Sequence, residues 1–122
     1  MILGLGIDLC PVDRIRDVIE RQGDAFLSRV YTPAERDYAT GAMRFDRLAA
    51  RWAAKEAAIK ALGGVSGIDW HDLCVVNADS GAPSLVLAGG AAARARQMGV
   101  TNILLSLSHA GGQAVAVVIL EG

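Results

Sequence analysis

Two carboxylates and a lysine are the residues of this chain best suited to chemistry on a phosphate group. Asp8 stands near the N-terminus, and Glu56 and Lys60 stand four residues apart in the middle of the chain. In a helix this spacing places Glu56 and Lys60 on one face. Mg²⁺ commonly binds through one or two carboxylates together with substrate phosphates and water. The three residues therefore predict a magnesium site in which Asp8 and Glu56 bind the metal and Lys60 neutralises phosphate charge.

His109 is a further candidate for donating a hydrogen bond to phosphate oxygens. It follows the alternating stretch 103–108 and precedes Gly111 and Gly112, so we expect it at the end of a strand beside a glycine turn. Taken alone, these residues favour an ordinary surface histidine near a turn.

The carboxylates also have structural interpretations that the sequence leaves open. Asp8 could serve the start of a following helix, because Pro11 suits a first helical position and Asp13 a first turn. Glu56 and Lys60 could form an ion pair on a solvated helix face, which contributes only about 0.2–0.5 kcal/mol. No Walker loop, dinucleotide fingerprint or Cys/His metal spacing is present.

The helix that must position Glu56 and Lys60 is predicted from the alanine-rich run 51–62, which Gly63 and Gly64 end. We expect it to begin between Arg44 and Leu48. Alanine at 50, 53, 54, 57, 58 and 61 would let a neighbouring sheet or helix approach its backbone, which predicts burial. Isolated buried ions are too costly to keep. The charged residues of this helix therefore need partners or ligands: Arg51, Lys55, Glu56 and Lys60.

The element that must position Asp8 is a strand predicted over residues 2–9. Its leucine and isoleucine side chains at 3, 5, 7 and 9 alternate with a second face that carries Gly4, Gly6 and Asp8. Glycines inside a strand often mark the close approach of another backbone or of a ligand. The glycine face that leads to Asp8 is therefore expected to lie against another backbone or a ligand.

The remaining elements complete an α+β fold in which a mainly antiparallel sheet packs on the long central helix. A helix is expected over 11–22, with Arg14 and Arg21 on one side, and Thr32-Pro33-Ala34-Glu35 predicts a capped helix start in which Glu35 is structural. Hairpins are expected from 73–77 with 84–87 and from 103–108 with 114–120, and a short helix from 91–98.

Length, composition and net charge limit the kinds of protein that this chain could be. The 122 residues are 52% hydrophobic and have no linker or repeat, which predicts one domain over 1–122. A net charge of -1 argues against a general binder of nucleic acid or membrane surfaces. The sequence shows no secretory signal and no membrane-spanning run, and Cys10 and Cys74 are predicted to be free thiols in a reducing cytoplasm.

Three motifs resemble those of the 4'-phosphopantetheinyl transferases, and in particular the short bacterial type, the holo-[acyl-carrier-protein] synthases. The motifs are Gly6-Ile7-Asp8, then Arg51-Trp52-Ala53-Ala54-Lys55-Glu56-Ala57 with Lys60, then Ser106-Leu107-Ser108-His109. Their order and spacing carry the resemblance, which runs from end to end of the chain. Trp52 stands where the family usually has Phe, and the loop 63–67 is shorter than usual and lacks the common Gly-Thr-Gly.

The resemblance implies transfer of the phosphopantetheine arm of coenzyme A to a serine of an apo acyl carrier protein, leaving adenosine 3',5'-bisphosphate. It implies that Asp8 and Glu56 hold Mg²⁺ and act with Lys60 in catalysis. It also implies coenzyme contacts at Lys60, Arg51, Ser108, His109 and Gly63, and docking of an acidic carrier protein on the first helix, at Arg14 with Arg21. A homotrimer with active sites between subunits is expected.

Two other functions remain open on the residues themselves. One is a non-catalytic module that binds coenzyme A or a carrier protein, although such a module need not keep both carboxylates. The other is a metal-dependent hydrolase of a nucleotide pyrophosphate. Within a transferase, either a metal-bound water or Glu56 could take the serine proton. The sequence leaves open whether the carrier serves fatty-acid or polyketide synthesis and whether acylated coenzyme A is accepted.

Overall fold

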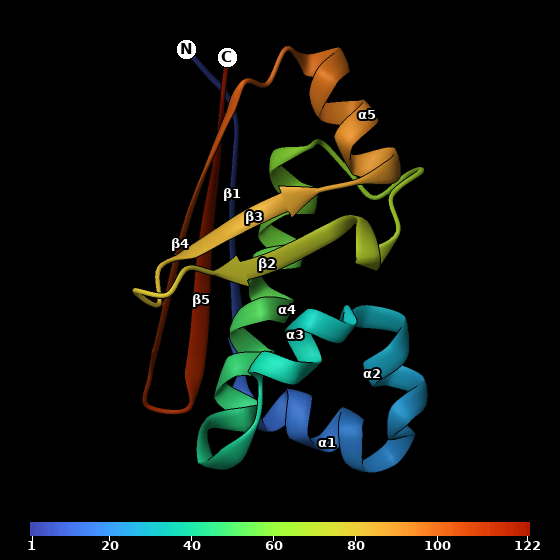
Figure 1. The fold of residues 1–122 in the computed structure, drawn as a ribbon, viewed down its shortest axis with the longest axis vertical. Coiled ribbons are helices and arrows are strands. Elements are labelled where there is room, and N and C mark those ends of the chain that lie inside the picture. The colour runs from blue at the N-terminus through green and yellow to red at the C-terminus, as the bar shows by residue number, and fades with distance from the viewer.

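The computed structural model describes all 122 residues. The elements in chain order are β1 (Ile2–Pro11), α1 (Val12–Gln22), α2 (Asp24–Val30), α3 (Pro33–Tyr38), a 3₁₀ turn (Gly41–Met43), α4 (Arg44–Ala61), a second 3₁₀ turn (Trp70–Asp72), β2 (Leu73–Asn77), β3 (Pro83–Leu87), α5 (Gly89–Met98), β4 (Asn102–Ala110) and β5 (Gln113–Glu121). Helices α1 to α3 gather at one end of the molecule, and α5 lies at the other end near both termini (Figure 1). The expected α+β fold is confirmed.

The strands form two antiparallel sheets. The long sheet has the order β1-β5-β4, and β2 pairs only with β3. Both predicted hairpins are therefore present. Strand β4 continues to Ala110, so His109 lies within the strand, opposite Ala114, and only Gly111 and Gly112 form the turn.

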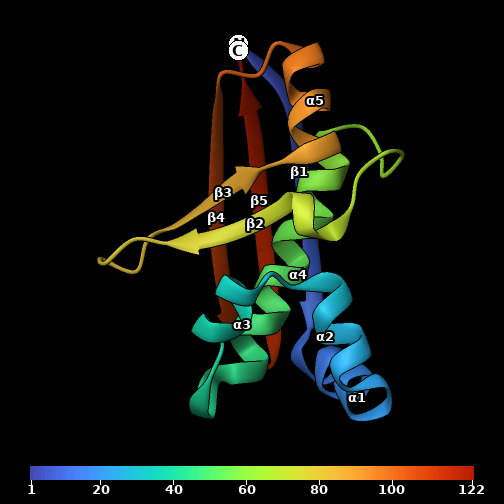
Figure 2. The ribbon, with the colours of Figure 1, turned by 45° about the vertical axis from the view of Figure 1, so that its right-hand side comes forward.

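The central helix α4 packs against the inner face of the long sheet (Figure 2). Helix and strand backbones approach so closely that a Cβ atom on Gly4 would lie 2.2 Å from the Ala61 carbonyl oxygen. A Cβ on Gly6 would lie 1.8 Å from the Ala57 oxygen. The glycine face of β1 is thus filled by the alanine face of α4, and the predicted buried helix is confirmed. Because the two faces cover each other inside one chain, neither is free to contact another subunit.

The outer face of the same sheet is apolar and uncovered. It carries Leu5 at 63% relative exposure, Ile7 and Leu9 at 58% each, and Leu104 at 46%. The partly buried β5 residues between them, Val115, Val117 and Ile119, continue this face. Contiguous exposed apolar surface of this kind marks an interaction site in proteins.

A buried ion pair fixes α4 to the elements beside it. Lys55 and Glu35 are both fully buried, with Lys55 Nζ 2.8 Å from Glu35 Oε1. Glu35 also accepts hydrogen bonds from the backbone N–H groups of Thr32 and Val75, and Lys55 donates to the carbonyls of Trp70 and Leu73. Each charge is therefore compensated. The capping box predicted at Thr32 and Glu35 is confirmed, and Glu35 is also the partner that the buried lysine of α4 needs.

Some boundaries differ from the expectation. Helix α1 begins at Val12 rather than Pro11, α5 begins at Gly89 rather than Ala91, and α2 carries no sequence signal of its own. The residue before α2 is Gly23, which makes no side-chain cap. None of the helices is long and apolar enough to cross a membrane.

Candidate functional site

The packing of β1 on α4 brings Asp8 beside the last turns of the helix. Gly4 lies against Ala61 and Gly6 against Ala57. Two strand residues advance about 6.6 Å and four helix residues about 6 Å, so the two elements stay in step over this distance. By the same step the next inward residue, Asp8, lies beside the turn between Ala53 and Ala57, which carries Glu56, and the long side chain of Lys60 reaches it from the following turn.

Lys60 joins the strand to the helix. Its Nζ donates to the Ile7 carbonyl oxygen at 2.9 Å and to Asp8 Oδ1 at 3.2 Å. The Asp8 side chain is 18% exposed and that of Lys60 is 54% exposed. The ion pair thus sits at the surface, and Lys60 pairs with Asp8 rather than with Glu56. An ammonium group has three donors, so one remains for another acceptor.

Glu56 completes the cluster from the same helix face. Burial raises the pKa of this half-buried carboxyl above its usual value, the negative charge of Asp8 raises it further, and Lys60 lowers it. The two carboxylates and the lysine therefore lie close enough to interact electrostatically. Their net charge of about -1, when ionised, favours a cation.

The donor set suits Mg²⁺ better than a transition metal. The structure contains no cluster of three or more His, Cys, Asp or Glu residues that could hold a metal ion. Two carboxylate side chains leave the other positions to water and phosphate oxygens, which is how Mg²⁺ is usually bound. A Zn²⁺ site would need three or four protein ligands.

Cys10, two residues after Asp8 on β1, has an unreactive thiol. Its side chain is fully buried, and burial, opposed by Arg14 and reinforced by Asp8 and Glu56, raises the pKa of the thiol to about 11. Thiolates, not thiols, are the reactive species. Cys10 and Cys74 are both free, as predicted.

Alkylation of the native protein by iodoacetamide at pH 8 should therefore label Cys74 well before Cys10. Cys74 is only half-buried, whereas Cys10 is inaccessible and almost entirely protonated at that pH. Peptide mass spectrometry after short exposures measures the two rates, and equal rates would mean that the inner face of β1 opens readily.

Ser108 and His109 are not brought to this cluster within one chain. Across β5, Leu9 lines up with Ser108 and Cys10 lines up with His109, so β5 separates both from β1 by two strand spacings, about 9–10 Å. Both residues are exposed. A hollow of about 140 Å³ lies beside them, with Leu9 on its far wall.

Arg51 also lies apart from the cluster. It is five residues from Glu56, about 140° around the helix, and is almost fully buried on the side of β2. Its guanidinium stacks over the Tyr38 ring at 4.4 Å and donates to the side-chain oxygen of Asn77. Its Nε has no partner, and the residue lines a cavity of about 200 Å³ together with Tyr38 and Asn77.

Gly63 follows Leu62, the C-cap residue of α4, with a positive φ of 86° that suits the turn ending the helix. Its N–H donates to the Lys60 carbonyl oxygen. The exposed loop 63–67 therefore begins one turn from the lysine of the cluster.

Arg14 and Arg21 are both exposed on α1, and neither makes an ion pair within the chain. The acid nearest in sequence, Asp13, is paired with Arg16 at 2.5 Å. Arg14 pairs neither with Asp13 nor with Asp17.

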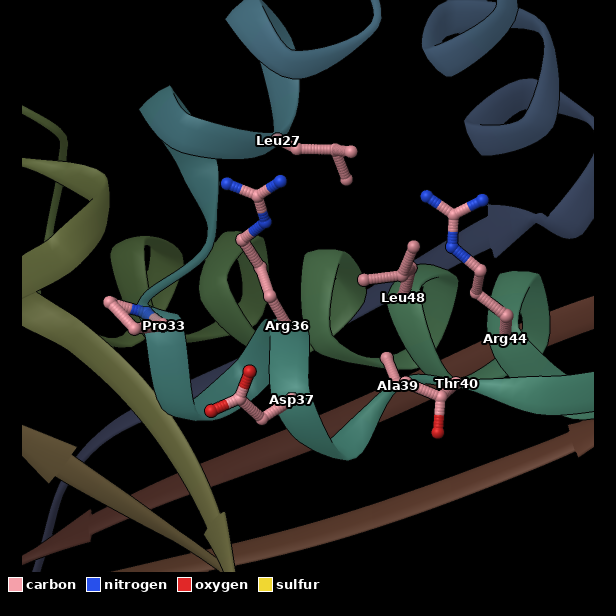
Figure 3. A pocket seen from close by; sticks show the side chains of 8 residues that line it. All are labelled: Leu27, Pro33, Arg36, Asp37, Ala39, Thr40, Arg44 and Leu48. Atoms are coloured by element: carbon pink, nitrogen blue, oxygen red, sulfur yellow. The ribbon is translucent and has the colours of Figure 1, made fainter.

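A larger cavity of about 390 Å³ opens between α2, α3 and the start of α4 (Figure 3). Arg36 and Arg44 extend along it, on either side of Leu48, as Figure 3 shows. Arg36 is already bonded to Asp24 and Ser28. The cavity contains none of the predicted site residues, and we assign it no role.

Comparison with known proteins places the whole chain in one group. Residues 4–118 match the family model of the 4'-phosphopantetheinyl transferase superfamily. Holo-[acyl-carrier-protein] synthase from Anaeromyxobacter dehalogenans is 53% identical over 100% of this chain and 98% of its own length. The Desulforudis audaxviator protein of the same name is 51% identical over 100% and 95%.

Solved structures of holo-[acyl-carrier-protein] synthases have the same fold as this chain. The Neisseria meningitidis holo-[acyl-carrier-protein] synthase superimposes with a TM-score of 0.90 at 27% identity, over 100% of both chains. The Helicobacter pylori protein of the same name, in complex with coenzyme A, gives a TM-score of 0.85 at 27% identity over 96% of this chain and 99% of its own.

Proposed function

Because the chain belongs to the 4'-phosphopantetheinyl transferase superfamily and is an enzyme of the holo-[acyl-carrier-protein] synthase type, we propose that it carries out a Mg²⁺-dependent transfer from coenzyme A to a serine of apo acyl carrier protein at the Asp8–Glu56–Lys60 cluster. The observation that carries this proposal is the coupling of two carboxylates and a lysine at the β1–α4 contact.

In this reaction the serine oxygen forms a bond to the phosphorus that bears the pantetheine arm. The bond from that phosphorus to the second phosphate breaks, and adenosine 3',5'-bisphosphate leaves with the bonding electron pair. Such transfers need mainly positioning and charge neutralisation. Lys60, with one donor free of the contacts to Ile7 and Asp8, is placed to bind a phosphate oxygen. Glu56 has two carboxylate oxygens, so one can bind the metal while the other accepts the serine proton.

Asp8 and Glu56 would hold Mg²⁺. When bound, the ion would supply positive charge that neutralises the pyrophosphate and the leaving group. Asp8 is kept in position for this by its ion pair with Lys60 and by the glycine contacts that hold β1 against α4.

The proposal is tested by incubating the protein with apo carrier protein, coenzyme A and Mg²⁺ and following adenosine 3',5'-bisphosphate by chromatography. We expect its release only when all components are present. Release without carrier protein would support a pyrophosphate hydrolase, and no release with coenzyme A bound would support a non-catalytic binding module.

We propose further that the protein is a homotrimer whose sites lie between subunits. The uncovered apolar face of the long sheet supports assembly. Ser108 and His109 are exposed at the end of β4 and too far from the carboxylates of their own chain, which supports a role for them in the site of a neighbouring subunit.

If the protein is a homotrimer, light scattering should give a particle mass of about three times the chain mass of 12.7 kDa. Leu104→Glu, which places a charge on the apolar face away from Asp8, should dissociate the trimer and reduce transfer with it. Val86→Glu is the matched control, because Val86 is 50% exposed on β3 outside this face. A wild-type protein of monomer mass at micromolar concentration would contradict the assembly.

Arg51 is proposed to bind coenzyme A. Its unpartnered Nε beside a cavity supports this role, since a buried guanidinium N–H without an acceptor is costly and a phosphate or carbonyl oxygen would supply one. Gly63 is proposed to contact the coenzyme through the loop that it begins.

Docking of the acidic carrier protein is proposed at Arg14 and Arg21. Both arginines lack an acid partner on α1, which leaves their charge available. The net charge of -1 gives the protein as a whole no attraction for an acidic partner, so a local patch must supply it.

Arg14→Glu should therefore raise KM for carrier protein strongly, because repulsion is added to the lost contact. KM for coenzyme A should stay nearly unchanged, and added salt should weaken the wild-type carrier interaction. Arg96→Glu on α5 is the control, because it makes the same charge change at an exposed site on another helix. An unchanged KM for carrier protein in Arg14→Glu would remove α1 from the docking surface.

The one-domain organisation of residues 1–122 and the cytoplasmic location stay predictions. The free thiols of Cys10 and Cys74 support the latter.

A further inference from the structure

The loop that follows α4 is held by a side chain to which no function has been assigned. Arg94, on α5, donates from Nη1 to the carbonyl oxygens of Leu62 at 2.9 Å and Gly64 at 3.5 Å, and from Nη2 to that of Ser66 at 2.6 Å. It makes no ion pair with any carboxylate. A single guanidinium group thus donates hydrogen bonds to three alternate carbonyl groups of one loop.

The start of α5 holds the other end of the same segment. Gly90 packs against the Gly67 carbonyl so closely that a Cβ there would lie 1.8 Å from the oxygen. Asp72 Oδ2 accepts hydrogen bonds from the N–H groups of Gly90 and Asp69. In Figures 1 and 2, α5 lies beyond the C-terminal end of α4, beside this loop. The segment from Leu62 to Asp72 is therefore fixed to α5 at both ends.

The backbone N–H groups of this loop differ in whether they have a partner. The N–H groups of Gly63 and Gly64 donate to carbonyl oxygens in the last turn of α4, whereas the N–H groups of Val65, Ser66 and Gly67 have no acceptor within the chain. These three residues are exposed. Successive unpaired N–H groups in a turn bind anions. The guanidinium adds a positive charge behind the loop.

We propose that Arg94 is a positioning residue for coenzyme A: it orders the loop 63–67 so that the N–H groups of Val65, Ser66 and Gly67 bind an anionic oxygen of the coenzyme. This inference rests on the proposed function, because it takes coenzyme A as the ligand. Arg94 itself need not touch the coenzyme, since its donors are occupied by the loop carbonyls.

The test compares Arg94→Gln and Arg94→Lys with Arg96→Gln, an exposed arginine of the same helix that holds no loop carbonyl. Arg94→Gln should raise KM for coenzyme A by about tenfold, because it loses charge-assisted hydrogen bonds that order the loop. Arg94→Lys should give an intermediate increase, since an ammonium group lacks the planar fork. KM for carrier protein and kcat should stay within about twofold, and Arg96→Gln should match the wild type.

A merely structural role for Arg94 would instead lower kcat through the folded fraction and leave both KM values unchanged, which would overturn the inference. A second measurement needs no variant. Titration of the ¹⁵N-labelled wild type with adenosine 3',5'-bisphosphate should shift the amide signals of Val65, Ser66 and Gly67, and unshifted signals at saturation would also overturn it. If the wild type transfers no phosphopantetheine, the proposed function fails; if it does so and the Arg94 variants behave as wild type, only this inference fails.

Discussion

Glu56→Gln is expected to abolish transfer to carrier protein while leaving the fold intact. The amide keeps the shape of the carboxylate but removes the charge that binds Mg²⁺. We expect transfer to fall by more than the roughly 10–100-fold that is typical when an outer-shell partner of a metal is lost. Stability should not fall, because the half-buried carboxylate is repelled by Asp8 and its burial already disfavours the charged form.

Asp8→Asn should have a comparable effect on transfer. It also removes the partner of Lys60, but that lysine is more than half exposed, so the lost ion pair costs the fold little. Asp46→Asn in the first turn of α4 is the control for removing a carboxylate from the same helix. Turnover and thermal unfolding are measured on all three variants. Near-normal turnover of Glu56→Gln with Mg²⁺ would show that the metal site lies elsewhere.

Gly6→Ala is expected to destabilise the protein by about 3 kcal/mol or more, at the upper end of overpacking effects. The new Cβ would lie 1.8 Å from the Ala57 oxygen and 2.8 Å from its carbonyl carbon, so α4 would have to retreat from the sheet. Strand β1 cannot yield instead without breaking its register with β5. Urea unfolding measures the change in free energy, and transfer should fall further because Asp8 moves away from Glu56.

The obstacle in Gly6→Ala is a backbone oxygen, so a second change of Ala57 to Gly should fail to restore stability. Val86→Ala, at an exposed strand position, controls for the effect of alanine in a strand. A Gly6→Ala protein as stable as the wild type would mean that β1 and α4 are not packed backbone to backbone.

The sequence allowed prediction of the carboxylate cluster because local patterns determine it. Alternation put Gly4, Gly6 and Asp8 on one strand face, and helical spacing put Glu56 and Lys60 on one helix face. Glycine and alanine faces then pack closely for steric reasons that residue size alone indicates. The helix start between Arg44 and Leu48 was predicted correctly, since α4 begins at Arg44.

Other parts depend on contacts between distant segments. The sequence could not show that β5 runs between β1 and β4, which is what separates His109 from Asp8. The capping pattern explains only part of the surroundings of Glu35, because its ion pair with Lys55 spans 20 residues. Arg94 gave no signal, since its partners are backbone carbonyls that any residue type could supply. Helix α2 has seven residues and no side-chain cap, too little for a pattern.

The most direct test of transfer at the Asp8–Glu56–Lys60 cluster is the intact mass of apo carrier protein after incubation with coenzyme A, Mg²⁺ and the enzyme. The wild type should add roughly 340 Da, the mass of the covalently transferred phosphopantetheine arm, and neither Glu56→Gln nor a wild-type reaction with excess chelator should add it. An unchanged carrier mass with the wild type, or full modification by Glu56→Gln, would contradict the assignment of this cluster as the transfer site.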